Sequence, residues 1–260
     1  MTKIIAIANQ KGGVGKTTTT INLAAALGLV DKKILLIDLD PQGNATMGSG
    51  INKHQLTYSS NDVLLGSISL SEAILKTDAG YHLLPANSDL TEAEVSLITQ
   101  TGREAALHRA MQNFNEHQPN TYEFIFIDCP PALNLLTVNA FTAADSVLIP
   151  MQCEYYALEG LAALLDTIEQ LKNSVNPHLK IEGIVRTMFD GRNRLAQEVS
   201  AGLLQHFNTT VYRTIIPRNV RLAEAPSHGL PAVLYDKSSQ GAAAYSVLAE
   251  EFLKQQMPQG

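Results

Sequence analysis

The run Lys11-Gly12-Gly13-Val14-Gly15-Lys16-Thr17-Thr18 decides the fold, because it places two glycines and a valine directly before a closing Gly-Lys-Thr. An apolar, β-branched stretch at 4–7 precedes the run, and an Ala/Leu-rich segment over 17–29 follows it. This order is typical of a strand, a glycine loop and a helix. The glycines let backbone N–H groups turn inward without Cβ clashes, and the helix N-terminus adds partial positive charge. The run 11–18 is therefore predicted to bind a polyphosphate.

Two side chains at the end of this loop have chemistry suited to a nucleoside triphosphate. We expect Lys16 to reach the β- and γ-phosphates and the Thr17 hydroxyl to ligate Mg²⁺. A glycine-rich turn that binds nothing is the alternative. The preceding strand, the following helix and the Gly-Lys-Thr ending all favour the nucleotide site.

Carboxylates follow two further predicted strands. The apolar stretch 33–37 ends in Asp38-Leu39-Asp40, and the stretch 124–127 ends in Asp128. In a doubly wound sheet, ligands bind at the carboxyl ends of strands, so these acids should face the phosphate loop. Asp128 matches the Walker B arrangement, in which the carboxylate holds Mg²⁺ through water. Asp38 is expected to support either the Mg²⁺ shell or Lys16, and the alternative for all three acids is a turn at a strand end.

The chain of 260 residues contains no linker-like, repeated or low-complexity segment. Strand and helix patterns alternate to its end, so we expect one α/β domain over 1–260 with the P-loop NTPase fold. Its architecture should be a doubly wound, mostly parallel sheet with helices on both faces. Further strands are predicted over 81–84, 146–150, 180–187 and 210–216, and helices over 62–75, 103–114, 134–144, 158–173, 195–207 and 242–254.

The two cysteines, Cys129 and Cys153, have no metal-ligand spacing. The chain has no signal peptide and no apolar run long enough to cross a bilayer, so we expect a cytoplasmic protein with free thiols and no membrane partner. Cys129 beside Asp128 could also suggest a redox or cluster ligand. A buried core thiol is the favoured interpretation for each cysteine.

Charge is unevenly distributed along the chain. The net charge is −6, with a pI of about 5.6. The segment 186–221 nevertheless holds six of the eight arginines, no lysine and only two acids, so it is four units positive and the remainder is ten units negative. A basic patch on an acidic body suits the phosphate backbone of a nucleic acid.

The phosphate loop departs from the general consensus, because the opening position holds Gln10 and the extra lysine Lys11 lies beside the phosphate site. This departure resembles the deviant loop of the partition and cell-division ATPases, the ParA/MinD family. The segments 147–160, 187–192 and 216–226 also resemble that family, most of all its chromosomal partition branch. The first predicted strand begins at Lys3, which leaves no room for the N-terminal helix-turn-helix of larger plasmid relatives. The tail 248–260 lacks the basic amphipathic character of the membrane helix in MinD-type relatives.

The resemblance implies an ATPase that drives DNA segregation, with ATP and Mg²⁺ as cofactors. It implies a homodimer closed over two ATP molecules, in which Lys11 reaches the partner's phosphates and Asp40 orients the attacking water. Pro217 and Asn219 would lie near the adenine, and Arg192 and Arg221 would bind double-stranded DNA without sequence preference. A centromere-binding partner of the ParB type would stimulate slow hydrolysis and so release a dimer associated with the nucleoid.

Other functions and other roles for the arginines remain open at this point. A MinD-like positioning ATPase would act on a membrane or polar cargo, and a metabolic kinase or synthetase would pass the γ-phosphate to a small acceptor. Arg192 and Arg221 could also be ion-paired surface or dimer-face residues. The sequence does not decide which of the remaining arginines contact DNA, namely Arg186, Arg194, Arg213 and Arg218.

Overall fold

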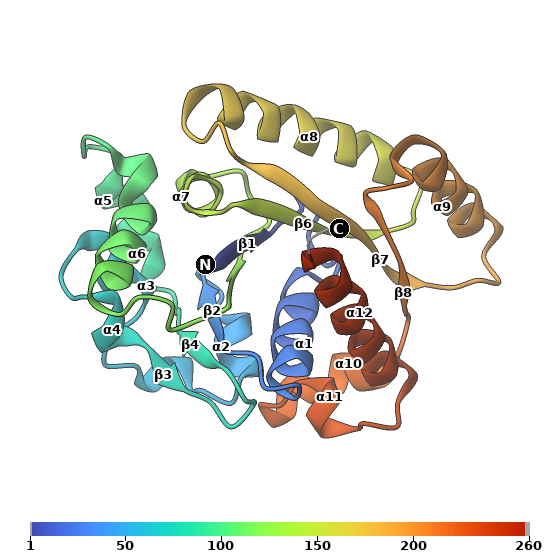
Figure 1. Ribbon diagram of the computed structural model, residues 1–260, viewed down its shortest axis with the longest axis horizontal. Helices are drawn as coiled ribbons and strands as arrows, with labels where there is room; N and C mark the ends of the chain where they lie inside the picture. Colours follow the sequence, from blue (N-terminus) through green and yellow to red (C-terminus); the bar gives the residue numbers. More distant parts are fainter. Residues whose placement is uncertain (1, 258–260) are drawn as a thin grey trace.

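The computed structural model describes residues 2–257, which form an eight-stranded sheet in the order β3-β4-β2-β5-β1-β6-β7-β8 (Figure 1). Neighbouring strands run parallel throughout, except where the short β3 pairs with β4. The predicted mostly parallel sheet is confirmed. The strands are β1 (Lys3–Ile7), β2 (Ile34–Asp38), β3 (Leu75–Lys76), β4 (His82–Leu84), β5 (Phe124–Asp128), β6 (Ser146–Gln152), β7 (Lys180–Phe189) and β8 (Val211–Pro217).

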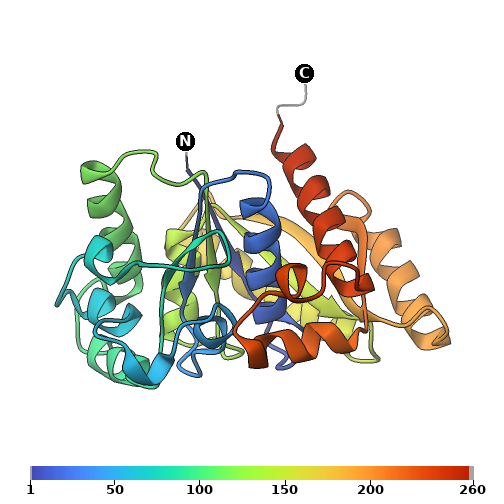
Figure 2. The same cartoon turned by 90° about the horizontal axis from the view of Figure 1, so that it is seen from below.

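Helices cover both faces of this sheet, as predicted. One layer contains α3 (Ser60–Leu65), α4 (Leu70–Ala73), α5 (Leu90–Leu97), α6 (Ala106–His117), α7 (Leu135–Ala143), α8 (Ala157–Ser174) and α9 (Arg194–Phe207). The other contains α1 (Lys16–Gly28), α2 (Asn44–Gly48), α10 (Val220–Glu224), α11 (Ala232–Tyr235) and α12 (Gln240–Gln256). Figure 2 looks onto this second layer, where α1 (blue) and α12 (red) run side by side.

Successive side chains of the central strands point to opposite faces of the sheet, so both helical layers pack against apolar side chains. In β5, Phe124 and Phe126 face the layer of α1 and α12, whereas Ile125 and Ile127 face the other layer. Phe252 of α12 packs edge-to-face on Phe124, with ring centroids 5.1 Å apart. Apolar side chains on both faces are what a parallel strand covered on both sides requires, and they produce the continuous apolar runs in the sequence.

The predicted helix over 62–75 is wrong. The segment forms two short helices, because Gly66 adopts φ 74° and ends α3. Ser69 and Glu72 then form a capping box that begins α4. The short helices α2, α5, α10 and α11 and the antiparallel β3 were not predicted. The other predicted strands and helices lie within a few residues of the observed ones.

A close approach between β7 and β8 occurs at Gly183. A Cβ on Gly183 would overlap the ring of Tyr212, which is buried beneath α12's layer. Tyr212 can occupy this space only because β7 has no side chain there.

The carboxyl ends of β1, β2 and β5 meet at one edge of the sheet. Asp38 and Asp128 are register partners on adjacent strands at that edge. The tail predicted to lack membrane character continues α12 to Gln256, and its last three residues, 258–260, lie outside the described part. Within the described part, no helix combines the length and the apolar character that crossing a bilayer requires.

Candidate nucleotide-binding site

The loop between β1 and α1 has the geometry of an anion cradle. Gly13 and Gly15 adopt φ values of 73° and 89°, which glycine reaches without strain. Gly15 is the N-cap of α1, yet no side chain caps this helix and its first turn has no acid. By contrast, side chains cap α7, α9 and α12. The free N–H groups at the start of α1 are therefore available to an anion.

Lys16 brings a nearly buried ammonium to this loop, with 7% of the residue exposed. Its Nζ donates to the Lys11 carbonyl oxygen at 3.2 Å. Burial lowers the pKa of Lys16, and the nearby carboxylates of Asp128 and Asp40 oppose that shift. An ammonium group has three N–H donors, so Lys16 retains capacity for phosphate oxygens.

Asp128 joins the loop to β5 through two hydroxyl groups. Thr17 Oγ1 donates to Asp128 Oδ2 at 2.7 Å, and Thr20 Oγ1 donates to Oδ1 at 2.9 Å. Burial and the neighbouring charge of Asp38 raise the pKa of Asp128. A hydroxyl and carboxylates at the foot of a phosphate cradle are the hard oxygen ligands that Mg²⁺ prefers, so the donor set fits this ion. Thr20 was not predicted, although it lies one helical turn after Thr17.

Asp38 anchors the loop that follows β2. It is fully buried, and burial raises its pKa. Its carboxylate accepts the Asp40 N–H at 3.1 Å, and the Thr46 N–H and hydroxyl at 2.9 and 2.7 Å. Neither Lys16 nor Thr17 is among its partners. The contacts therefore make Asp38 the anchor that positions Asp40. Its predicted support of the Mg²⁺ shell or of Lys16 stays a prediction.

Asp40 lies at the phosphate loop, with 7% of its surface exposed. Its charge acts on both Lys16 and Asp128. Oδ1 accepts the Gln42 N–H at 3.0 Å, whereas Oδ2 accepts no hydrogen bond from any of residues 2–257. One carboxylate oxygen is therefore available to a water molecule.

Lys11 forms an ion pair with Glu154 of the same chain, and both side chains are almost half exposed, at 45% and 46%. The Lys11 N–H donates to Asn9 Oδ1 at 3.0 Å, and Asn9 Nδ2 donates to the Pro150 carbonyl oxygen at 2.8 Å. A hollow of about 520 Å³ opens beside Lys11, and Tyr156 is among its lining residues. Lys11 therefore lies at the surface rather than inside its own phosphate cradle.

The loop is also tied to β7, close to the residues predicted beside the adenine. Thr187 Oγ1 donates to the Val14 carbonyl oxygen at 2.7 Å. Two residues further along β7, Phe189 pairs with Pro217 at the end of β8. Asn219 then caps α10. The predicted base-side residues thus lie at and just after the end of β8, the strand that pairs with β7, and their contact with a base stays a prediction.

The arginine-rich segment divides into buried and exposed side chains. Arg186 is 5% exposed, so it is not a surface residue. Its Nη1 donates to Ser200 Oγ at 2.9 Å, and its Nη2 donates to the carbonyl oxygens of Tyr212 and Arg213 at 2.9 and 3.0 Å. Arg186 therefore ties β7 to α9 and β8.

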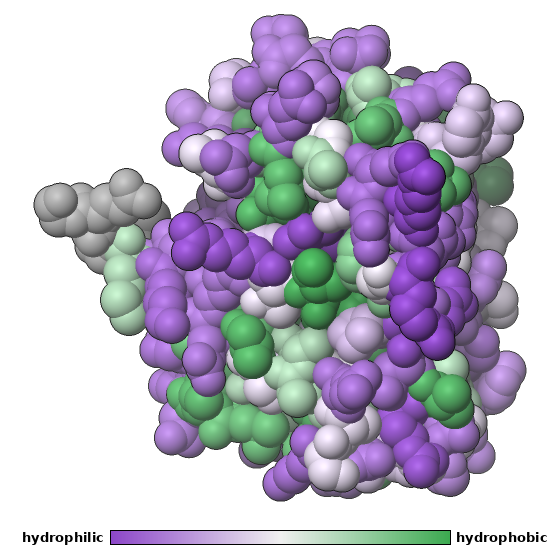
Figure 3. Space-filling view, turned by 90° about the vertical axis from the view of Figure 1, so that its right-hand side faces the viewer, coloured by the Kyte–Doolittle hydropathy of each residue, from purple (hydrophilic) through white to green (hydrophobic). Residues whose placement is uncertain are grey.

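The two arginines predicted to bind DNA are ion-paired within the chain. Arg192 contacts Asp190 at 2.9 Å, and Arg221 contacts Glu224 at 2.7 Å and Asp236 at 3.2 Å. Arg194 pairs in the same way with Glu198. Figure 3 views the side of the molecule where α9 and β8 lie, and hydrophilic side chains there surround separate apolar ones. Arg213 and Arg218 are exposed, and their side chains form no ion pair with any of residues 2–257.

Cys129 and Cys153 are both buried and free, in agreement with the prediction of core thiols. Burial raises the pKa of each thiol, that of Cys153 to about 11. Both side chains therefore remain neutral thiols that pack within the core.

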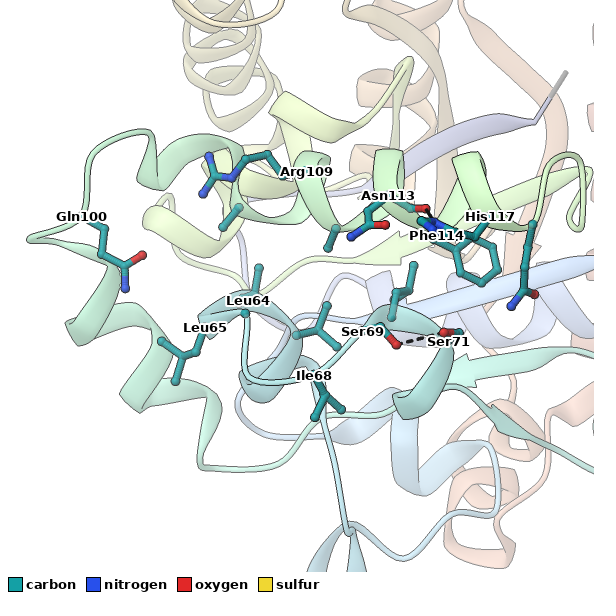
Figure 4. A pocket seen from close by; sticks show the side chains of 16 residues that line it. Leu64, Leu65, Ile68, Ser69, Ser71, Gln100, Arg109, Asn113, Phe114 and His117 are labelled. Carbon is teal, nitrogen blue, oxygen red and sulfur yellow. Dashed lines mark hydrogen bonds between the residues drawn. The ribbon is translucent and has the colours of Figure 1, made fainter.

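A separate groove of about 600 Å³ lies between α6 and the α3–α4 turn (Figure 4). Leu64 and Ile68 line it from the α3–α4 segment, and Phe114, Arg109 and His117 line it from α6 on the opposite side. None of its lining residues belongs to the run 11–18. The groove is therefore not part of the nucleotide site.

Comparisons with known proteins agree with this geometry. Residues 2–181 match the family described as "AAA domain". The chain is 49% identical over 252 residues to the sporulation initiation inhibitor protein Soj of Bacillus subtilis, which covers 96% of this chain and 98% of the relative. It is 48% identical over 255 residues to the chromosome partitioning protein ParA of Caulobacter vibrioides, with 98% and 95% covered.

Solved structures show the same fold. Cobyrinic acid a,c-diamide synthase from Mycobacterium smegmatis, with bound ATP analog and magnesium, superposes with a TM-score of 0.84 at 38% identity, covering 98% of this chain and 96% of that one. The septum site-determining protein MinD from Pyrococcus horikoshii, complexed with Mg-ADP, gives a TM-score of 0.78 at 28% identity, with 98% and 97% covered.

Proposed function

The chain belongs to the ParA/Soj family of chromosome-partitioning P-loop ATPases, and from this premise we propose that it is an ATP-driven switch that holds and releases DNA during segregation. The single observation that supports the proposal best is the position of Lys11. Its side chain lies at the surface beside the loop that holds Lys16, where it could reach a nucleotide bound by a second copy.

The chain is an ATPase that uses ATP and Mg²⁺. Lys16 and the free N–H groups of α1 would hold the phosphates, and Thr17 together with Asp128 would hold Mg²⁺. When bound there, the metal would neutralise charge that develops during phosphoryl transfer. Asp40 is proposed to orient the attacking water through its available oxygen, and Asp38 keeps Asp40 in place.

The switch requires two copies of the chain. Each Lys11 would leave Glu154 and contact the phosphates bound by the other copy, where its charge would stabilise the transferred phosphoryl group. Dimerisation would place two arginine-bearing surfaces on one particle, so that avidity holds it on DNA. We propose Arg192 and Arg221 as phosphate contacts, Pro217 and Asn219 as adenine neighbours, and 1–260 as one ATPase domain.

Hydrolysis would separate the two copies and release the DNA. A centromere-binding partner of the ParB type is proposed to stimulate this step, and the dimer is proposed to associate with the nucleoid in the cytoplasm. A MinD-like positioning role is less supported, because the solved MinD is 28% identical whereas Soj and ParA are 49% and 48% identical. The synthetase is likewise more distant, at 38%.

DNA retardation and particle sizing with ATP, ADP and no nucleotide, each at two salt concentrations, test the proposal. We expect dimers and retarded random-sequence duplex only with ATP, and a steep loss of binding as salt rises. Liposome binding without DNA binding would favour the MinD-like role. A chain that stays monomeric when saturated with ATP and Mg²⁺ would disprove the switch.

A further inference from the structure

Asp190 holds Arg192 in the manner in which a phosphate group would hold it. Arg192 Nε donates to Asp190 Oδ1 and Nη2 donates to Oδ2, both at 2.9 Å. The Arg192 backbone N–H also donates to Oδ1, at 3.0 Å. The two parallel hydrogen bonds form the bidentate fork that arginine makes with carboxylates and phosphates alike.

This pair lies at the surface. The Arg192 side chain is 92% exposed and that of Asp190 is 37% exposed. The hydrogen bonds from Arg192 lower the pKa of Asp190 to about 2, so the carboxylate is ionised at neutral pH. The guanidinium of Arg192 is thus compensated until another anion replaces Asp190.

Arg218 lies near the same carboxylate. Its backbone N–H donates to the Phe189 carbonyl oxygen at 3.4 Å, which places Arg218 beside the residue that precedes Asp190. The charge of Arg218 further lowers the pKa of Asp190. The side chain of Arg218 is exposed and forms no ion pair with a described residue. Arg192, Asp190 and Arg218 together therefore carry one net positive charge, contributed by the arginine that the family resemblance did not single out.

We propose that Asp190 is an internal competitor for DNA phosphate at Arg192, and that Arg218 is a further phosphate-binding residue of the same patch. A phosphate that docks on Arg218 displaces Asp190 from Arg192 and takes over its two hydrogen bonds. The inference rests on the proposed DNA-binding function, and it explains what limits the affinity of the protein for DNA. An affinity held below its maximum suits a protein that must leave DNA after each cycle.

Asp190→Asn is the decisive variant, because the Asn oxygen can still accept the Arg192 backbone N–H while the charge competition is removed. An exposed ion pair contributes up to about 1 kcal/mol, so in the presence of a non-hydrolysable ATP analogue we expect random-sequence duplex to bind up to about fivefold more tightly for each of the two patches that contacts it. The matched control is Glu169→Gln, which removes a carboxylate from another exposed ion pair, with Lys172 on α8, and changes the net charge equally.

Arg218→Gln tests the second half of the proposal. It should weaken DNA binding on the order of tenfold at low salt and reduce the slope of log affinity against log salt by about one. Arg109→Gln is its control, because Arg109 is exposed on the distant α6. ATP-dependent dimerisation of all four variants should equal that of the wild type.

The outcomes separate the inference from the proposed function. Asp190→Asn that binds DNA no more tightly than Glu169→Gln overturns the competitor role. Arg218→Gln that matches Arg109→Gln overturns the additional contact. Wild-type protein that fails to retard duplex under any nucleotide condition overturns the proposed function and the inference together. Because the key variant is expected to gain binding, misfolding cannot produce the supporting result.

Discussion

Replacing Glu154 by glutamine should make ATP-dependent dimerisation easier. Glu154 pairs with Lys11 inside one chain, and the proposed dimer requires Lys11 to contact the phosphates bound by the other copy. The ion pair must therefore break before the dimer closes. Glu154→Gln removes the charge that holds Lys11 while it keeps the size and polarity of the side chain.

The expected magnitude follows from the exposure of the pair. Both side chains are almost half exposed, at 45% and 46%, so solvent screens the attraction. Exposed pairs of this kind contribute about 0.2–1 kcal/mol. Two pairs break for each dimer, so the free energy of dimerisation should become more favourable by about 0.4–2 kcal/mol, which corresponds to a 2- to 30-fold lower dissociation constant. The difference should shrink at high salt.

Sedimentation velocity over a dilution series, with a non-hydrolysable ATP analogue and Mg²⁺, measures this dissociation constant. Glu159→Gln is the matched control, because Glu159 lines the same hollow beside Lys11 and forms no ion pair with a described residue. Its dissociation constant should equal that of the wild type. The same series with ADP should give monomers for every variant.

A double variant shows whether Glu154 acts through Lys11. In a Lys11→Ala background, Glu154→Gln should have no further effect, since the pair is already lost. Dimers of Glu154→Gln that are no tighter than those of Glu159→Gln would refute the reasoning, and weaker dimers would indicate that Glu154 contacts the second copy.

Three further variants probe the site and the sheet. Lys16→Ala should abolish nucleotide binding in calorimetry, because it removes the buried ammonium from the loop; retained ATP affinity would contradict its phosphate role. Asp40→Ala should bind ATP and remain a DNA-bound dimer without turnover in a phosphate-release assay, and normal hydrolysis would remove Asp40 from its proposed role. Gly183→Ala should lower the free energy of unfolding by about 1–3 kcal/mol in urea, because the new Cβ overlaps the Tyr212 ring, whereas Gly160→Ala, with open space around it, should not destabilise.

Much of the fold could be predicted because its signals are local. The run 11–18, the apolar stretches that end in Asp38 and Asp128, and the regular helix patterns each fix an element from a few neighbouring residues. The break between α3 and α4 also has a local cause, Gly66, but the apolar pattern continues across this glycine and therefore predicts one helix. The proximity of Lys16, Thr17 and Asp128 could be predicted because the carboxyl ends of parallel strands lie at the same edge of a sheet.

The remaining features depend on contacts between distant parts of the chain. Glu154 lies 143 positions from Lys11, and Thr187 lies 173 positions from Val14, so no spacing rule links either pair. Arg186 and Arg192 belong to the same arginine-rich segment, yet Arg186 is buried and Arg192 is exposed. The composition of 186–221 indicated a basic patch, but only the placement of individual carboxylates shows how much of its charge is compensated.

The hydrogen bond from Thr187 to Val14 connects β7 to the phosphate loop, and the same strand leads into the turn that holds Asp190 and Arg192. The strand touches the phosphate loop at Thr187, and three residues later the chain reaches Asp190. A substitution that displaces β7 will therefore perturb triphosphate handling and polyanion docking at once. Laboratory evolution toward tighter DNA retention should consequently accumulate changes in the turn after Phe189 rather than within the strand, where selection for turnover opposes them.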